Sequence, residues 1–308
     1  MSVRHRRTAA AVVIAAAAVA GAFAPAIANA APQATFLNGT AGNHLTISNG
    51  TPWVVMNGTR VNFGTDVRDL AWNPSGTKAA FVDSQGNLDV ANPNGTGRVV
   101  VAKNPGGQTW SHPTWQVAKA YQGDEVPAKD NLIFVASKAG VTRLETVPAT
   151  ARNGKPAQLS LNAYFGEGST PLPTTANNWP NSGGDVGTIV YDNAKTGEVY
   201  IRDDYLRQQG GSFVKGSEPA LSPSGEEIVF VRSVAGHDHI FETSLTDSKH
   251  VAHDLTPHAT TNYTEPTFSP DGRTIAFRTP TGIDTIGDNG RGAPVQVSSY
   301  TGLAAYRG

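Results

Sequence analysis

The sequence contains no cysteine in its 308 residues. Disulfide bonds, catalytic thiols and thiolate metal ligands are therefore excluded. A chain of this length does not depend on disulfides, because a domain of about 150 to 300 residues buries enough apolar surface to fold without them. The stability of the fold must come from packing and hydrogen bonding.

Charged residues are also scarce, at 16% of the sequence, and the formal net charge is -1. Three arginines lie within the first 30 residues, which contain no acidic residue. Without that segment the chain has 21 basic and 25 acidic residues, a net charge of -4. No basic field is present that could hold a phosphate backbone, so a nucleic-acid partner is disfavoured.

Motifs of the common catalytic sites are missing as well. The sequence has no G-x-S-x-G nucleophile elbow, no H-E-x-x-H zinc motif and no glycine-rich phosphate loop before a helix. The sequences D-G and D-N-G are typical of turns. They do not indicate calcium loops, because the alternating acidic ligands and the final Glu of such a loop are absent. We therefore predict no catalytic residues, and the sequence favours a binding protein over an enzyme.

Residues 1–30 have the pattern of a signal peptide. A basic start is followed by an apolar stretch rich in Ala and Val, residues 9–24, and an A-x-A cleavage site ends at Ala30. We expect cleavage after Ala30 and an exported protein, secreted or periplasmic, without a membrane span after cleavage. A membrane anchor is the alternative, but the apolar stretch is short and Pro25 ends it. An adjacent pair of arginines leaves the twin-arginine export route open beside the general one.

Glycine and proline are abundant, with 33 and 20 residues, as short strands joined by tight turns require. Residues 266–277 combine two apolar, β-type runs with Pro270, Asp271 and Gly272 between them. Pro favours the second position of a turn, Asp its third, and Gly the positive φ that follows. The pattern recurs in two further stretches, each with an aromatic or Leu anchor nine residues before a Phe, at residues 219–230 and 70–81. Three copies with one spacing form a repeat.

Five anchors mark the repeating unit along the chain, namely Trp72, Trp115, Trp179, Leu221 and Phe268. Successive anchors are separated by 43, 64, 42 and 47 residues. The longest step contains an irregular insertion, residues 149–178, with an added strand expected near residues 159–165. Roughly 40–50 residues per four-stranded unit is typical of β-propeller blades. An open β-sandwich is the alternative, but sandwiches do not give this regular repeat.

The two ends of the chain are predicted to share one blade. Residues 44–48, 53–56 and 59–63 are strand-like and are joined by segments containing Asn-Gly, which favours hairpins. These three strands lack a fourth, and residues 304–307 supply it. We therefore predict an all-β fold over residues 31–308. It is a six-bladed β-propeller of four-stranded antiparallel blades, closed by the C-terminal strand, which joins the N-terminal blade.

The repeated turn resembles that of a known family. The stretches W-N-P-S-G, L-S-P-S-G and F-S-P-D-G, which begin at Trp72, Leu221 and Phe268, are each followed by an apolar triplet ending in Phe. They resemble the WD-like propeller repeat of TolB-type proteins over nearly all of residues 35–307. TolB is an envelope protein whose propeller binds a peptidoglycan-associated lipoprotein and follows an α/β domain. The strands here begin soon after the signal peptide, so the resemblance implies a stand-alone, TolB-like propeller without that domain.

Candidate binding residues follow from propeller geometry. The first strand of each blade lines the central channel, so equivalent positions at its start surround one channel mouth. Counting three residues back from each anchor gives Asp69, His112, Ala176, Glu218 and Glu265. The four polar ones, Asp69, His112, Glu218 and Glu265, are predicted to bind a protein or peptide partner, or a cation. The alternative is that they are solvated side chains at the starts of strands.

A second cluster, His237-Asp238-His239, contains residue types that bind metals. No third ligand is identified for it, so a polar hairpin tip is the better interpretation. We predict no metal site and no resident cofactor, and the question of a cation at the channel mouth stays open.

Two functions remain open at this point. The first is a secreted, monomeric, non-catalytic propeller that binds a protein or peptide in the cell envelope or the extracellular space. The second is a propeller-fold lyase or hydrolase that acts on a polysaccharide or another polymer with a metal at the channel mouth. His112, Glu218 and Glu265 would then be the residues involved, and the metal content of the purified protein would separate the two functions.

Overall fold

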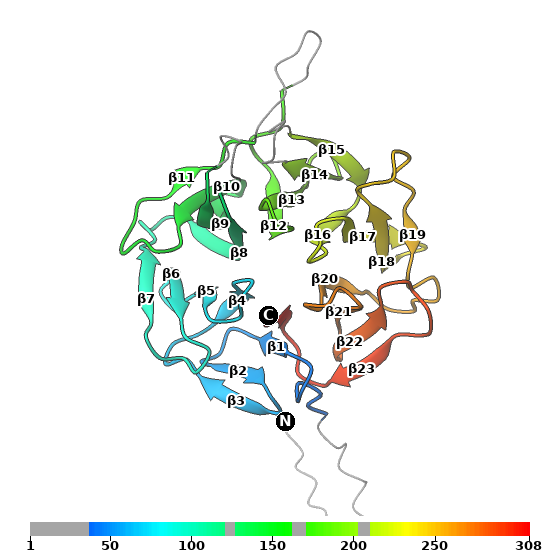
Figure 1. Ribbon diagram of the computed structural model, residues 1–308, viewed down its shortest axis with the longest axis horizontal. Helices are drawn as coiled ribbons and strands as arrows, with labels where there is room; N and C mark the ends of the chain where they lie inside the picture. Colours follow the sequence, from blue (N-terminus) through cyan, green and yellow to red (C-terminus); the bar gives the residue numbers. More distant parts are fainter. Residues whose placement is uncertain (1–36, 121–126, 162–170, 203–209) are drawn as a thin grey trace, which may run out of the picture. The chain divides into compact units, whose positions relative to one another are not determined.

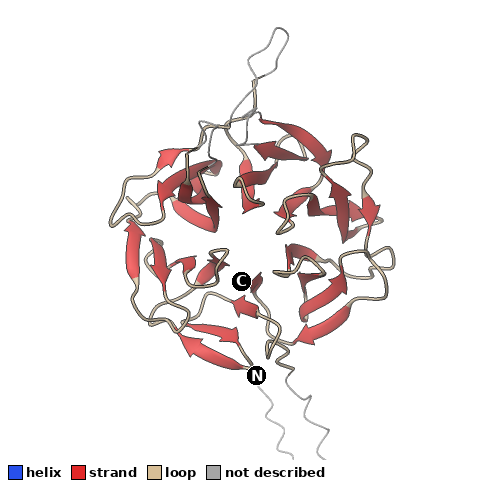
Figure 2. Cartoon of the chain, in the orientation of Figure 1, coloured by secondary structure: helices blue, strands red, loops and turns tan. Residues whose placement is uncertain are grey.

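The structure, a computed structural model, describes residues 37–120, 127–161, 171–202 and 210–308. The predicted signal peptide, residues 1–30, lies outside these residues. Within them every regular element is a β-strand, and Figure 1 shows the strands gathered into sheets around a common centre. Figure 2 shows the same ring as strands joined by loops and turns.

The strands form six four-stranded antiparallel sheets, numbered here as blades 1 to 6 along the chain. From the innermost strand outward, blade 1 contains β24 (Leu303–Tyr306), β1 (Leu45–Ser48), β2 (Trp53–Met56) and β3 (Thr59–Asn62). Blade 2 contains β4 (Arg68–Trp72), β5 (Ala79–Val82), β6 (Leu88–Ala91) and β7 (Val99–Ala102). Blade 3 contains β8 (Thr109–Ala118), β9 (Lys129–Lys138), β10 (Val141–Pro148) and β11 (Ala157–Gln158).

The last three blades follow the same order from the centre outward. Blade 4 contains β12 (Asn177–Gly183), β13 (Thr188–Asn193), β14 (Glu198–Arg202) and β15 (Gly210–Lys215). Blade 5 contains β16 (Ser217–Leu221), β17 (Glu227–Val234), β18 (His237–Ser244) and β19 (His253–Asp254). Blade 6 contains β20 (Thr264–Phe268), β21 (Thr274–Thr279), β22 (Gly282–Gly287) and β23 (Val295–Ser298). The predicted six-bladed propeller is confirmed.

Ring closure by the C-terminal strand is also confirmed. β24 pairs antiparallel with β1 over four residue pairs, from Leu45 opposite Tyr306 to Ser48 opposite Leu303. The first and last strands of the propeller therefore belong to one sheet, as Figure 1 shows where the red C-terminal strand meets the blue β1. The inner edge of β1 is thereby paired.

The repeated turn stabilises itself through local hydrogen bonds. In blade 6 the Ser269 hydroxyl donates to Asp271 at 2.6 Å and accepts the N–H of Thr274 at 3.0 Å. The N–H of Gly272, whose φ is 73°, donates to the Ser269 carbonyl. Because Gly adopts a positive φ without steric cost, the turn reverses the chain at this point. The turn therefore joins the first and second strands of the blade, as predicted.

The core lies between the faces of neighbouring blades. Each second strand contributes a large side chain that is at most 1% exposed, namely Ile47, Phe81, Phe134, Tyr191, Phe230 and Phe277. Phe81, for example, packs in one cluster with Val54 and Met56 of blade 1. Burial contributes roughly 1.5–3 kcal/mol for such a side chain. Because the contacts connect consecutive blades, they stabilise the ring as a whole.

The innermost strands of blades 2 to 6 share a β-bulge near their start. In β16, Ser217 faces Val231 and Ala220 faces Val229, so the two residues between them face a single partner. The first bulge residue has φ between 48° and 56° in all five blades, at Asp69, His112, Trp179, Glu218 and Glu265. This conformation costs roughly 1–2 kcal/mol for a residue with a Cβ. The bulges persist because other contacts hold them.

Proline occupies the second bulge position in four of the five blades, at Pro113, Pro180, Pro219 and Pro266. A residue in a bulge makes no hydrogen bond to the neighbouring strand, so proline, which has no N–H, is tolerated there. β24 pairs with β1 at consecutive residues and has no bulge, so blade 1 does not contribute a bulge residue to the channel.

The register of blade 4 differs from the prediction. Ser182 faces Ile189, which is the pairing that the anchors make in the other blades. Ser182 therefore occupies the anchor position, and Trp179, predicted as the anchor, occupies the bulge position. Ala176, which we placed at the mouth, precedes β12 and does not belong to the set of bulge residues. The prediction was wrong because the stretch W-P-N-S-G in blade 4 resembles W-N-P-S-G in blade 2. Its Trp stands three residues before the anchor position, whereas the Trp of blade 2 stands at that position.

The irregular insertion contains a short strand directly before the residues near which one was expected. β11 pairs with β10 and serves as the fourth strand of blade 3. It therefore precedes the expected residues 159–165. Residues 162–170 lie outside the described part of the chain.

Candidate functional site

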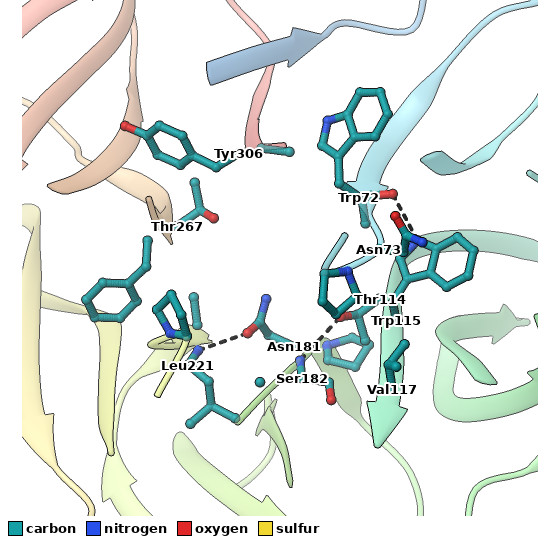
Figure 3. Close-up of a pocket in the computed structure, with 18 of the residues that line it drawn as sticks. Trp72, Asn73, Thr114, Trp115, Val117, Asn181, Ser182, Leu221, Thr267 and Tyr306 are labelled. Atoms are coloured by element: carbon teal, nitrogen blue, oxygen red, sulfur yellow. Dashed lines mark hydrogen bonds between the residues drawn. The ribbon is translucent and has the colours of Figure 1, made fainter. Parts of the chain in front are cut away.

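The innermost strands of all six blades surround a cavity of about 840 Å³ in the central channel. Ligand sites in proteins commonly have volumes of about 300–1,000 Å³. Figure 3 shows lining residues around one open space, with the Asn181 side chain reaching into it. Five blades contribute aromatic side chains to the lining, Trp72, Trp115, Trp179, Phe268 and Tyr306. The channel is large enough to admit an extended segment of a partner or a small ligand.

Three of the predicted binding residues, His112, Glu218 and Glu265, line this cavity, and Trp179 lines it with them. They come from the bulges of blades 3 to 6, near the starts of the innermost strands, and we call this end of the channel its mouth. Asp69 is in the equivalent position of blade 2 but is not among the lining residues. The structure thus brings together most of the predicted set.

Two of the carboxylates also connect neighbouring blades. Asp69 Oδ2 accepts the N–H of His112 at 3.1 Å, and Glu218 Oε2 accepts the N–H of Glu265 at 2.6 Å. In both cases the N–H belongs to the bulge residue of the next blade. A charge-assisted bond of this kind is about twice as strong as one between neutral groups. The predicted binding residues therefore also hold the strained bulges in place.

A second set of contacts between blades lies further along the innermost strands, two residues after the bulge residues. Thr114 Oγ1 accepts the N–H of Ser182 at 3.2 Å, and Asn181 Oδ1 accepts the N–H of Leu221 at 2.9 Å. Figure 3 shows both bonds as dashed lines. Each acceptor stands one residue before an anchor position and each donor is the anchor residue of the following blade. The side-chain amide nitrogen of Asn181 remains directed into the open space.

Burial makes the carboxyl groups at the mouth weak acids. The pKa of Glu218 is raised to about 7, mainly by burial; the N–H bond from Glu265 lowers it, and the charges of Glu265, Asp192 and Asp238 contribute to the rise. Burial also raises the pKa of Glu265, although Arg278, 2.9 Å away, lowers it. The negative charge of the mouth therefore grows as the pH rises through neutrality.

His112 carries the opposite shift. Burial lowers its pKa, and the nearby Asp69 carboxylate opposes that effect. The imidazole ring lies 3.7 Å from the Trp179 ring, between centroids, at a tilt of 47°. His112 is therefore a neutral, aromatic part of the mouth near pH 7, opposite in character to the glutamates.

We predict that Asp69→Asn lowers the pKa of His112 further. Asn retains an oxygen that accepts the His112 N–H but removes the negative charge that favours the imidazolium form. NMR titration of the His112 ring measures the change, with the exposed His258 as an internal reference. An unchanged or increased pKa of His112 would contradict the assigned contact.

Metal-binding groups are not assembled at the mouth. In the described part of the chain, no three or more His, Asp or Glu side chains are placed to hold a metal ion. In the second candidate cluster, His237-Asp238-His239, the His239 side chain is 4% exposed and its Nδ1 lies 2.8 Å from Asp254 Oδ2, so Asp254 is its partner. His237 begins the same strand, after the turn, rather than lying at the hairpin tip.

Sequence reasoning missed Trp179, which lines the mouth, and Asp192, which lies buried near Glu218. The X-Pro dipeptide that marks the bulge could have revealed Trp179, because Trp179-Pro180 matches Glu218-Pro219 and Glu265-Pro266. Asp192 lies on the second strand of blade 4 and is 4% exposed. Its proximity to Glu218 arises from contacts between blades, for which the sequence gives no local signal.

No family model matches the sequence, and no curated protein matches it. Solved structures do match. TolB from Acinetobacter baumannii is 15% identical with a TM-score of 0.57, over 85% of this chain and 65% of that chain. A putative TolB from Agrobacterium tumefaciens is also 15% identical with a TM-score of 0.57, over 84% of this chain and 89% of that one.

This chain shares its fold with the TolB propellers. The fold also occurs elsewhere, since a chain of a nidogen/laminin complex is 9% identical with a TM-score of 0.59, over 86% of this chain and 98% of that chain. At these identities the likeness concerns the fold, and function must be argued from the site. The TolB-like propeller spans 65% of the A. baumannii chain. In the described part of the present chain, no helix is long and apolar enough to cross a membrane.

Proposed function

We propose that this TolB-like propeller is exported and binds a cationic segment of a protein or peptide in the cell envelope or the extracellular space, without catalysis. The observation that carries the proposal is the pair of bulge residues Glu218 and Glu265, which line one mouth of an open channel beside each other. The Glu218 carboxylate offers an acceptor to an ammonium or guanidinium group, and Glu265, whose Oε1 is paired with Arg278, adds negative charge beside it. The signal-peptide pattern of residues 1–30 supports export.

The shape of the channel supports binding of an extended segment. The cavity continues from the mouth past aromatic side chains and the polar groups of Asn181 and Thr267. Such a lining accepts both apolar side chains and peptide groups. The neutral ring pair of His112 and Trp179 stands at the same mouth and provides a stacking surface for an apolar or planar group next to the cation.

A charge-neutral variant tests the proposal. A fluorescein-labelled peptide of Lys and Gly is expected to bind the purified protein at pH 8, where Glu218 is ionised, and a Glu and Gly peptide of equal length is not. Glu218→Gln/Glu265→Gln is expected to weaken binding of the Lys peptide roughly tenfold or more, since about 1.4 kcal/mol corresponds to a factor of ten. Fluorescence anisotropy measures both dissociation constants.

The matched control removes two exposed carboxylates of the same charge, in Glu226→Gln/Asp247→Asn, and is expected to bind as the wild type does. Added salt should weaken wild-type binding more than it weakens binding by the double Gln variant. Equal affinity of the wild type and the Gln variant would rule out the acidic mouth as the binding site.

A second candidate function is a lyase or hydrolase on a polysaccharide or another polymer, with a metal at the mouth. The observation that favours it is that one imidazole and two carboxylates, from His112, Glu218 and Glu265, line the same cavity, although their side chains among the described residues are not placed to hold a metal ion together. Elemental analysis of the purified protein separates the two functions. A stoichiometric transition metal that is lost in Glu218→Gln/Glu265→Gln would favour the enzyme.

A further inference from the structure

A chain of carboxylates links blades 4, 5 and 6 at the channel mouth. The backbone N–H of Glu218 lies near the Asp192 carboxyl on β13 and favours its ionised form, and Glu218 Oε2 in turn accepts the N–H of Glu265 at 2.6 Å. Both N–H groups belong to bulge residues with positive φ, 51° and 56°, where the strand ladder is interrupted. Glu218 therefore fastens the strained bulge of blade 6, and the Asp192 carboxyl lies beside the strained bulge of blade 5.

The charges around this cluster are mostly of one sign. Glu218 faces Asp192, Glu265 and Asp238 of β18, all of which are acidic. Asp192 faces the Asn178 side chain and the Glu218 N–H. Glu265 faces Asp69 of blade 2, beside His112, and Arg278 of its own blade. Arg278 neutralises one carboxylate, so the cluster is negative when all of its members are ionised.

Burial makes that negative charge costly. Asp192 is 4% exposed, and its Oδ1 and the Oε2 of Glu265 are buried without a hydrogen-bond partner among the described residues. An ionised carboxylate in such a place loses its hydration without full replacement. Burial accordingly raises the pKa of Asp192 to about 6, beside the value of about 7 for Glu218. Both groups change charge near neutral pH.

We propose that Asp192, Glu218 and Glu265 form a proton-controlled latch that joins blades 4, 5 and 6 at the channel mouth. With protons on the cluster, the carboxyl groups still accept the bulge N–H bonds, although more weakly than ionised carboxylates do. Protonation also removes the cost of burying charge and the repulsion between the groups, and the cost of burial exceeds the contribution of the N–H bond at Glu218, so the latch is tight. When the protons leave, buried negative charges face each other and the three blades separate more readily at this mouth. The latch needs no partner, so it goes beyond the proposed binding function.

The direction of the pH dependence follows from proton linkage. The folded state retains protons that the unfolded chain releases, so stability falls as the pH rises between the ordinary and the raised pKa. For Glu218 this interval runs from 4.5 to about 7, and for Asp192 from 3.8 to about 6. The latch is fully closed below these intervals and loosened above them.

Amide hydrogen exchange of the purified protein tests the latch at the two bulge N–H groups beside it, those of Glu218 and Glu265. After correction for the intrinsic exchange rate, the protection factors of the Glu218 and Glu265 amides are expected to fall about tenfold or more between pH 5 and pH 8, since one unit of pKa shift corresponds to a factor of ten. The Val55 amide, in the β1–β2 ladder of blade 1, is expected to keep its protection.

Isosteric variants locate the effect. Glu218→Gln retains an acceptor oxygen and is expected to keep the Glu265 amide protected at both pH values, and Asp192→Asn is expected to do the same for the Glu218 amide. Glu226→Gln, an exposed glutamate of the same blade, is the matched control and should show the wild-type fall. The thermal midpoint should decrease less from pH 5 to pH 8 in Glu218→Gln than in the wild type. A wild type without the fall, or a Glu218→Gln variant with the same fall, would overturn the latch.

Discussion

Removal of residues 303–308, which contain β24, is expected to abolish cooperative folding of the propeller. The strand provides four residue pairs with β1, and the Thr46 hydroxyl donates to its Ala305 carbonyl at 2.8 Å. Ala304 packs in a core cluster with Leu45 and Ile47, which would become exposed. Burial of each large apolar side chain contributes roughly 1.5–3 kcal/mol, and the total stability of a domain is about 5–15 kcal/mol. Loss of the strand therefore removes a large part of the stability.

Circular dichroism during urea unfolding measures this effect, because a two-state transition should become broad or disappear. A shorter truncation that removes only Arg307 and Gly308 is the control. It loses the Arg307 bond to the Gly76 carbonyl and the contact with the Trp72 ring but keeps all of β24, so a cost of about 1–2 kcal/mol is expected. A synthetic peptide of residues 301–308 should restore the transition by pairing with β1. A truncated protein as stable as the wild type would show that ring closure is dispensable.

The blades were predictable because their defining signal is local. Ser269, Pro270 and Gly272 specify a turn through their own hydrogen bonds and dihedral angles, so the turn forms wherever the motif occurs. The spacing of the motif then fixed the number of blades. Even the shared N- and C-terminal blade followed, since three strands without a fourth leave an edge that another strand must cover.

The mouth was predicted less completely, because it depends on register. A shift of three residues in blade 4 placed Ala176 where Trp179 belongs. The bulge itself was not predicted, although it decides which side chains enter the channel. Asp69 shows the limit of symmetry arguments, because it occupies the bulge position of blade 2 and accepts the His112 N–H as Glu218 accepts that of Glu265, yet it does not line the cavity.

Contacts between blades were beyond sequence reasoning altogether. The link from Asp192 to Glu218 joins the second strand of one blade to the first strand of the next. Neither residue belongs to a sequence motif that predicts a contact with the other. Their raised pKa values arise from burial and from neighbouring charges, both of which are properties of the assembled ring.

Because of the register of blade 4, alanine substitutions of Trp115 and Trp179 are expected to lower the free energy of unfolding by very different amounts. Trp115, a true anchor, is 7% exposed, packs in a core cluster with Leu132, and donates its ring N–H to the Ala71 carbonyl at 3.1 Å. Trp115→Ala should cost about 3–5 kcal/mol of unfolding free energy through the cavity it leaves. Trp179 belongs to none of the core clusters of the described residues and stacks on His112. Trp179→Ala should cost only about 1 kcal/mol, the worth of one aromatic contact.

Urea unfolding of the two variants, with equal slopes, gives the two free energies directly. If Trp179 were the anchor, as its W-P-N-S-G context suggests, both substitutions would cost the same. A second readout separates the roles further, because loss of the Trp179 ring should shift the NMR signals of the His112 ring while Trp115→Ala leaves that stacking partner in place. A residue that resembles a core anchor by sequence would then be established as part of the channel mouth. The bulge, rather than the repeated turn, would be the feature that determines which side chains a partner meets.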